Sequence, residues 1–219
     1  GGSAPGIWTL EQVAYYQGTG EWPKKSFVRE LYNWGLNGDS TIGDNTVVNR
    51  SSPVQIGTLT NWSSISFASK TGAATRSDGT LWNWGFLVHD GVTTINNRSS
   101  PIQVGALTNW ASIILSLNGT STDNYALKYD DSLWVYGKNA QGSLGLGNEI
   151  ETSSPVQLGA LDWYKVAGGN ASAISIKTNN TLWSWGFNLY GQLGQNTSVT
   201  SVQSPVQIGA LATWSDCSA

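Results

Sequence analysis

The stretch Leu182-Trp183-Ser184-Trp185-Gly186 decides the fold, because the chain contains it in four versions. The others are LYNWG at 31–35, LWNWG at 81–85 and LWVYG at 133–137. The fourth residue of each version is aromatic, and successive versions place it 50, 52 and 49 residues apart (Trp34, Trp84, Tyr136, Trp185). A repeat of about 50 residues that holds several short strands is typical of a β-propeller. The sequence therefore predicts an all-β protein built from similar blades.

Two further phrases follow each version. One is SPVQIG or a close variant, and the other is Leu-x-x-Trp or a close variant. Each complete unit is then expected to form four strands: one that begins at the tryptophan of the last phrase, a short one that ends in a basic residue, the LWxWG phrase, and the PVQIG phrase. Because proline cannot donate a backbone hydrogen bond, we expect it to begin the fourth strand and this strand to lie at an outer edge. The prolines are Pro53, Pro101, Pro155 and Pro205.

Most of the twelve tryptophans belong to these phrases, so their abundance is no evidence for a stacking site. Alternate residues of a strand point to opposite faces, so Trp82 and Trp84 should share one face, and Leu81 and Asn83 the other. A blade is covered by neighbours on both faces, so large side chains are tolerated on both. The tryptophans are therefore predicted to pack between blades.

The spacing of the phrases divides the chain into an N-terminal module and a propeller region. Residues 1–25 combine a linker-like start with a capping-box pattern at Thr9, which predicts a short amphipathic helix over about 10–17. This helix either caps the first blade or joins the repeats to another domain or chain. The propeller region, 26–219, contains three complete blades and two partial ones: 26–61 (partial), 62–109, 110–162, 163–213 and 214–219 (partial).

Two arrangements are open for the partial blades. The C-terminal piece either pairs with the N-terminal piece to close a small four-bladed ring, or the blades belong to a longer array. The chain has no methionine and stops in the middle of a unit. Both features favour the longer array, and with it a segment of a longer polypeptide.

Composition argues against several classes of function. The chain has 11% charged residues, a net charge of −3 and scattered lysines and arginines, so no nucleic-acid partner is predicted. No apolar run approaches the ~18 residues of a membrane span. The single histidine, His89, cannot build a histidine metal site, and Cys217 has no histidine nearby. We therefore predict no catalytic residue, no metal and no cofactor, although carboxylates from separate loops could still meet as a glycosidase pair.

Candidate binding residues are sought where one copy departs from the others, because the blade does not explain them. The second copy departs after Gly85, at Phe86, His89 and Asp90. The third copy has 26 residues from Trp110 to Tyr136, against 22 between the equivalent residues of the second and fourth copies. Neutral drift in surface loops is one explanation. The functional hypothesis is a recognition patch formed by loops at 86–97 and 118–125, with Asn118, Asp123, Asn124 and Tyr125 from the second of them.

The unit at 163–209 resembles the regulator-of-chromosome-condensation repeat. Trp185 to Gly194 match its W-G-x-N-x-x-G-x-L-G stretch, Tyr136 to Gly145 nearly match it, and Trp34 to Gly43 match it in part. The resemblance covers about 26–219 and implies a β-propeller, usually of seven blades with about 50 residues each. The chain departs from the family where a histidine commonly ends the first strand. The opening residues also resemble short modules in structural proteins of marine bacteriophages.

Three functions are consistent with this sequence. The first is a non-enzymatic structural or interaction module of a larger virion-associated or extracellular protein, which contacts other protein chains in assembly or surface attachment. The second is a regulatory protein-binding propeller that promotes nucleotide exchange or inhibits an enzyme. The low charge argues mildly against the second, since such a surface is usually charged. The third is a carbohydrate-binding module that recognises glycans.

Overall fold

The computed structural model describes residues 28–219 apart from residues 69, 90–94 and 120. These residues form one two-stranded and three four-stranded sheets, all antiparallel. Helix 10–17 and the linker, both predictions, lie outside the described residues. The strands are β1 (Tyr32–Gly35) and β2 (Arg50–Gln55); β3 (Trp62–Ala68), β4 (Thr71–Arg76), β5 (Leu81–His89) and β6 (Ile95–Gln103); β7 (Trp110–Asn118), β8 (Ser121–Lys128), β9 (Leu133–Gly137) and β10 (Thr152–Gln157); and β11 (Trp163–Gly168), β12 (Ser172–Lys177), β13 (Leu182–Phe187) and β14 (Ser201–Gln207). A short 3-10 turn, η1 (Ala140–Gly142), follows β9.

Each four-stranded sheet follows the predicted order of strands. The first strand pairs with the second, the second with the third and the third with the fourth, so the fourth lies at an outer edge. The prolines do not begin these strands, which corrects the prediction: β10 begins at Thr152, three residues before Pro155. The pairing of β10 with β9 is irregular between Thr152 and Val156. Within this bulge the ladder requires no backbone N–H from residue 155, so a proline is tolerated inside the strand.

The hydrophobic core is divided into three clusters, and each lies between two neighbouring sheets. In one of them, Trp163 and Trp185 pack against Tyr125 and Leu144 of the preceding blade. Trp84 and Trp82 belong to a second cluster and Leu81 to a third, which confirms the predicted division of the two faces. Within the clusters the tryptophans meet edge to face, as in the pair Trp163–Trp185 with ring centroids 5.8 Å apart. The tryptophans therefore hold blades together, as the sequence predicts.

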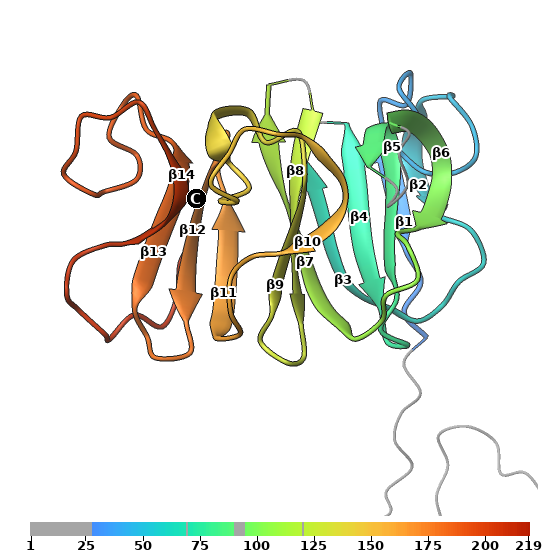
Figure 1. Cartoon of the computed structure of the whole chain (residues 1–219). Coiled ribbons are helices and arrows are strands. Elements are labelled where there is room, and N and C mark those ends of the chain that lie inside the picture. Colours follow the sequence, from blue (N-terminus) through green and yellow to red (C-terminus); the bar gives the residue numbers. More distant parts are fainter. Residues whose placement is uncertain (1–27, 69, 90–94, 120) are drawn as a thin grey trace, which may run out of the picture.

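The sheets stand side by side in an open row. The two-stranded sheet β1–β2 lies at one end and the sheet β11–β14 at the other (Figure 1). Residues 214–219 form no strand, but the amide of Trp214 donates to the carbonyl of Asn180 at 3.2 Å, as the amide of Trp110 does to Gly79 at 3.1 Å. This segment thus occupies the place where the first strand of a further blade would begin. The two ends of the row do not meet.

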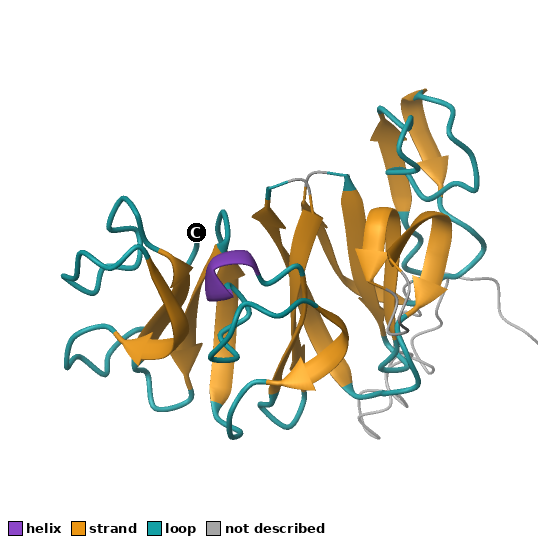
Figure 2. Ribbon diagram, turned by 45° about the horizontal axis from the view of Figure 1, so that its top comes forward, coloured by secondary structure: helices purple, strands orange, loops and turns teal. Residues whose placement is uncertain are grey.

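The antiparallel order sorts the connections into two edges of the row. The loop edge holds the turns between first and second strands and the long loops 36–49, 138–151 and 188–200 between third and fourth strands. The hairpin edge holds the turns between second and third strands and the links from one blade to the next. Figure 1 shows η1 at the top, on the loop edge, and the β12–β13 turn at the bottom, on the hairpin edge; Figure 2 shows the long loops from a second direction.

Candidate functional site

The long loops of the loop edge are held by one asparagine each, which we call the clamp asparagines. Each follows the LWxWG phrase by two residues and is buried. Its Oδ1 accepts a hydrogen bond from the amide five residues further on, and its Nδ2 donates to the carbonyl eleven residues further on. The distances are 2.9 and 3.2 Å for Asn37 (to Ile42 and Val48), 2.9 and 2.9 Å for Asn139 (to Leu144 and Ile150), and 3.1 and 3.0 Å for Asn188 (to Leu193 and Val199).

Each clamp displays an apolar side chain at the same position of its loop. Val48, Ile150 and Val199 supply the carbonyls that the clamps hold, and their side chains are 56%, 69% and 49% exposed. Because buried amides fix the backbone beneath them, these side chains are presented on ordered loops. Three loops therefore offer apolar contacts at equivalent places along one edge of the row.

Three cations of this edge are paired with carboxylates, and Glu149 accepts a hydrogen bond from Gln203 Nε2 at 3.0 Å. Lys70 contacts Asp39 at 2.7 Å, and Lys138 contacts Glu151 at 3.0 Å. Arg50 contacts Asp44 at 2.7 Å, and the Asp44 side chain is nearly buried. Partial burial opposes ionisation of Asp44, but hydrogen bonds from Thr46 and Arg50 outweigh it and lower the pKa of its carboxyl group. The loop edge thus combines apolar and polar side chains, and these ion pairs form no patch of a single charge.

The second copy has no clamp asparagine, and Leu87 stands at the equivalent position. Without the clamp, β5 and β6 continue as long strands of nine residues each. Phe86 is half-buried, and Lys70 Nζ lies 5.1 Å from the centre of its ring. The side chain of His89 and all of Asp90 lie outside the described residues. A binding role for these three residues stays a prediction.

The structure differs from the sequence interpretation at 118–125, where a loop was expected. The extra residues lengthen β7 and β8, and Asp123, Asn124 and Tyr125 are buried inside the blade. Asp123 accepts hydrogen bonds from Asn118 Nδ2 at 2.7 Å and from Ser143 Oγ at 2.6 Å, so it anchors the loop that follows β9. The added residues of β7 and β8 pair with each other, as Leu117 does with Thr122 and Asn118 with Ser121, which favours longer strands over a loop because backbone groups are then satisfied.

Two of these residues join neighbouring parts of the fold. Asn124 Oδ1 accepts a hydrogen bond from Asn83 Nδ2 of the preceding blade at 3.0 Å. The hydroxyl of Tyr125 donates to the carbonyl of Ser143 at 2.6 Å, and burial raises the pKa of this tyrosine well above its ordinary value. Asn118 is the member of the set that borders an open cavity, of about 450 Å³, which Lys138, Gln141 and Asn170 also line. The arrangement makes Asp123, Asn124 and Tyr125 supports of the blade.

The hairpin edge contains a repeated stacking arrangement that the sequence analysis did not predict. The basic residue that ends the second strand lies between two tryptophans: Lys128 Nζ is 4.8 Å from the ring centre of Trp110 and 4.4 Å from that of Trp134. Trp134 Nε1 donates to Ser132 Oγ at 2.9 Å, and Ser132 Oγ donates to Asp130. The hydrogen bonds from Ser132 lower the pKa of Asp130. These residues fix the turn. The signal available in the sequence was the recurrence of a basic residue, an Asp/Asn-x-Ser/Thr pattern and a tryptophan at fixed positions.

Two further classes of site find no support here. Among the residues that the structure describes, no three His, Cys, Asp or Glu side chains come together in a group that could hold a metal ion. Within the same part of the chain, no helix is long and apolar enough to cross a membrane. The loop edge, with its three clamped loops, is therefore the candidate binding site.

The fold is similar to that of solved regulator-of-chromosome-condensation propellers. The model of the regulator of chromosome condensation (RCC1) repeat matches residues 130–176 and 179–219. This confirms the resemblance over those two stretches. No curated protein sequence matches the chain. The comparisons do not support the phage resemblance.

Solved structures show the same fold at low sequence identity. Yeast RCC1 (Prp20), solved with Kap60, has a TM-score of 0.73 and 16% identity, with 87% of this chain and 48% of that chain covered. Prp20p of Saccharomyces cerevisiae, studied with its binding to Gsp1p and histones, has a TM-score of 0.68 and 18% identity, with 84% of this chain and 47% of that chain covered. Human WBSCR16 has a TM-score of 0.52 and 15% identity, with 82% of this chain and 66% of that chain covered. The chain thus spans about half the length of the yeast propellers.

Proposed function

We propose that the chain is a regulatory protein-binding propeller module without catalytic activity, and that its partner binds the loop edge. The observation that carries this proposal is the equivalent exposure of Val48, Ile150 and Val199 on three loops that buried asparagines hold in place. Loops on a rigid scaffold are the usual place for recognition. Ordered apolar side chains lose little conformational entropy when a partner covers them.

The chemistry of this edge fits a folded protein with an apolar patch of its own. Its carboxylates Asp39, Asp44 and Glu151 already neutralise neighbouring cations, so they offer little to a basic peptide. The core of a protein interface is poor in unpaired charge and rich in apolar contact, with polar groups around it. The loop edge has this composition.

The comparisons favour this function over the other two. The similar yeast propeller was solved with the protein Kap60, and Prp20p was studied with its binding to Gsp1p and histones. Those partners belong to the yeast proteins, and for this chain they support protein binding as a class. A virion or extracellular setting, a role in assembly or attachment, and glycan recognition remain predictions that neither the structure nor the comparisons support.

Capture and direct binding measurements test the proposal. Proteins that the immobilised wild-type chain retains from a cell lysate are identified and purified. Each is then titrated against the wild type and against the triple variant Val48→Asp, Ile150→Asp, Val199→Asp. We expect affinity for the partner to fall at least about tenfold, or ~1.4 kcal/mol. The matched control is Leu107→Asp, Leu161→Asp, Leu211→Asp, which changes equally exposed residues of the hairpin edge.

The control separates a local effect from a general one. If only the hairpin-edge variant loses the partner, or if both variants lose it equally, the loop edge is not the binding site. A glycan array run with the same two variants addresses the carbohydrate alternative. Glycan binding that is lost with the loop-edge variant, in the absence of any protein partner, would replace the proposed function.

A further inference from the structure

Two seams between neighbouring sheets share a backbone arrangement but differ in their side chains. In the first seam, between β1–β2 and β3–β6, Lys70 Nζ contacts Asp39 at 2.7 Å and lies 5.1 Å from the ring centre of Phe86. The amide of Phe86 donates to the carbonyl of Lys70 at 2.9 Å. In the third seam, between β7–β10 and β11–β14, the amide of Phe187 donates to the carbonyl of Ala171 at 2.8 Å. Ala171 therefore stands where a lysine crosses the first seam.

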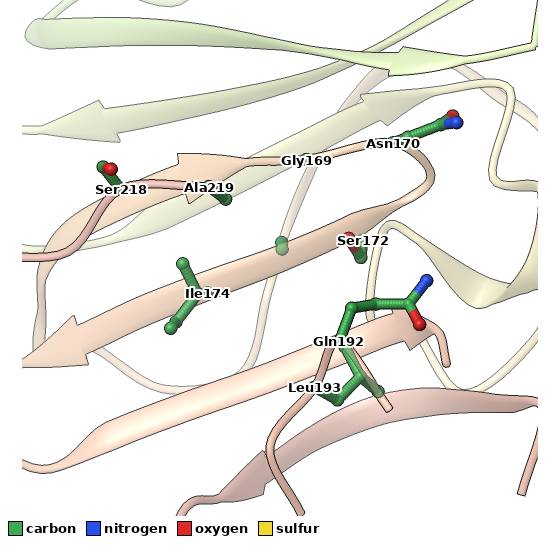
Figure 3. Close-up of a pocket in the computed structure, with 9 residues that line it drawn as sticks. Gly169, Asn170, Ser172, Ile174, Gln192, Leu193, Ser218 and Ala219 are labelled. Carbon is green, nitrogen blue, oxygen red and sulfur yellow. The ribbon is translucent and has the colours of Figure 1, made fainter. Parts of the chain in front are cut away.

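A cavity of about 450 Å³, which we call the seam cavity, lies where the third seam lacks this side chain. Both sheets of the seam line it, through Asn118, Ala140, Gln141, Ala171 and Phe187. Figure 3 shows Asn170, a further lining residue, at the turn between β11 and β12, with its side chain directed away from Ile174. The volume lies in the range of about 300–1,000 Å³ that is typical of ligand pockets.

The charges at the seam cavity favour an uncharged occupant. Gln141 and Asp39 each follow a clamp asparagine by two residues, so an amide stands where the first seam has the carboxylate that receives Lys70. Lys138 also lines the cavity, but its ammonium group already pairs with Glu151 at 3.0 Å. A further charge buried here would gain no partner of opposite sign, which is costly.

The walls of the cavity match an aromatic ring with a polar tip. The methyl groups of Ala140 and Ala171 and the half-buried ring of Phe187 provide apolar surface. Aromatic rings favour edge-to-face contact with one another, and a tyrosine hydroxyl requires a hydrogen-bond partner when it is buried. The amide of Gln141 can donate to or accept from such a hydroxyl group. A tyrosine side chain meets these conditions without adding charge.

The cavity adjoins the surface that we assign to the protein partner. Lys138 and Ala140 flank the clamp residue Asn139, whose Nδ2 donates to the carbonyl of Ile150 at 2.9 Å. The side chain of Ile150 is 69% exposed on this clamped loop. A partner that covers Ile150 therefore also reaches the seam cavity. An aromatic side chain buried in a pocket is typical of the residues that dominate the affinity of an interface.

We propose that the partner inserts one tyrosine side chain into the seam cavity, with its ring against Ala171 and Phe187 and its hydroxyl group on Gln141. The inserted side chain takes the place that Lys70 takes in the first seam. This inference rests on the proposed function for the source of the tyrosine. The cavity itself can be tested without the partner.

An NMR titration with N-acetyl-tyrosinamide tests the cavity on the isotope-labelled 219-residue chain. We expect saturable shifts of the amide resonances of Ala140, Gln141 and Phe187. N-acetyl-lysinamide should bind at least about tenfold more weakly, because its charge finds no free carboxylate in the cavity. The proposal is overturned if the tyrosine probe gives no saturable shifts, or if the lysine probe or glucose binds more tightly than the tyrosine probe.

A pair of variants assigns the shifts to the seam cavity. Gln141→Asp with Ala171→Lys builds the ion pair of the first seam into the third, and it should abolish the shifts. The matched control, Asp39→Gln with Lys70→Ala, changes the equivalent positions of the first seam and should leave them unchanged. Circular dichroism checks that both variants fold, and Ala140→Trp is a second way to fill the cavity if the first does not. Shifts that persist in a folded variant with a filled cavity would contradict the assignment.

The same filled variant connects the cavity to the partner. With a protein identified by capture, filling the cavity should weaken binding at least about tenfold, as expected for the loss of a central aromatic contact. Unchanged affinity for a partner that the loop-edge triple variant no longer binds would overturn tyrosine insertion and leave the proposed function intact. If capture yields no partner, the proposed function fails, and the probe titration still decides whether the cavity accepts a tyrosine side chain.

Discussion

Trp185 and Trp34 occupy the same position of the same phrase, yet one is fully buried and the other is 59% exposed. Trp185 lies in the interface between the third and fourth sheets, where the preceding blade provides Tyr125 and Leu144. Trp34 lies at the end of the row, on the face of β1 that no further sheet of the described structure covers. The contribution of a repeated residue to stability is therefore set by the neighbouring blade and not by the phrase.

The largest expected difference is between Trp185→Ala and Trp34→Ala. Removal of the buried indole leaves a cavity between two blades and should lower the free energy of unfolding by about 3–5 kcal/mol. Removal of the exposed indole should change it by less than ~0.5 kcal/mol at concentrations where the chain is monomeric. Urea unfolding followed by tryptophan fluorescence measures both. Equal losses would show that Trp34 is covered in solution.

A second difference concerns the clamps of an inner and an end blade. Asn139→Ala should cost at least ~2 kcal/mol, because the amide of Leu144 and the carbonyl of Ile150 lose their partner in a buried place. Asn188→Ala should cost less, since the last blade has an open face that admits water. Urea unfolding and limited proteolysis of loops 138–151 and 188–200 compare them. A larger loss for Asn188→Ala would contradict this distinction.

A smaller effect is expected where a cation lies between two tryptophans of the inner blades. Lys128→Met keeps most of the side chain's volume and removes the charge from above Trp110 and Trp134, and it should cost about 1 kcal/mol. Lys138→Met removes only an exposed pair with Glu151 and should cost less than ~0.5 kcal/mol. Thermal unfolding at two salt concentrations measures both. A loss for Lys138→Met as large as that for Lys128→Met would count against the stacking argument.

The smallest effect is a pH dependence at the end sheet. Hydrogen bonds from Thr46 and Arg50 lower the pKa of Asp44 in the folded chain, so its carboxylate stabilises the fold above the unfolded pKa of about 3.9. This stabilisation is lost as the pH falls through the lower, folded pKa. Asp44→Asn should therefore be less stable than wild type at pH 6 and approach it as the pH falls below about 4. If the difference in stability between Asp44→Asn and wild type does not depend on pH, the loss arises from altered hydrogen-bond geometry and not from the charge of Asp44.

Much of the fold could be predicted from the sequence, but less of the site could. The strands, the outer edge and the inter-blade tryptophans follow from local patterns, such as alternation at Trp82 and Trp84, that recur in each copy. The proline position failed because a bulge at Pro155 depends on the pairing of two strands. Among the candidate binding residues, Asp123, Asn124 and Tyr125 looked like a variable loop because an insertion that lengthens two strands has the same length as one that enlarges a loop.

The sequence by itself determined the repeat, the strand order within a blade and the role of its aromatics, because each depends on residues close together in the chain. Only the tertiary structure decided that the described sheets stand in an open row and that Trp34 is exposed. The physical reason is that burial requires a second surface. Whether a blade's face has one depends on the curvature and number of all the blades, which no single phrase specifies.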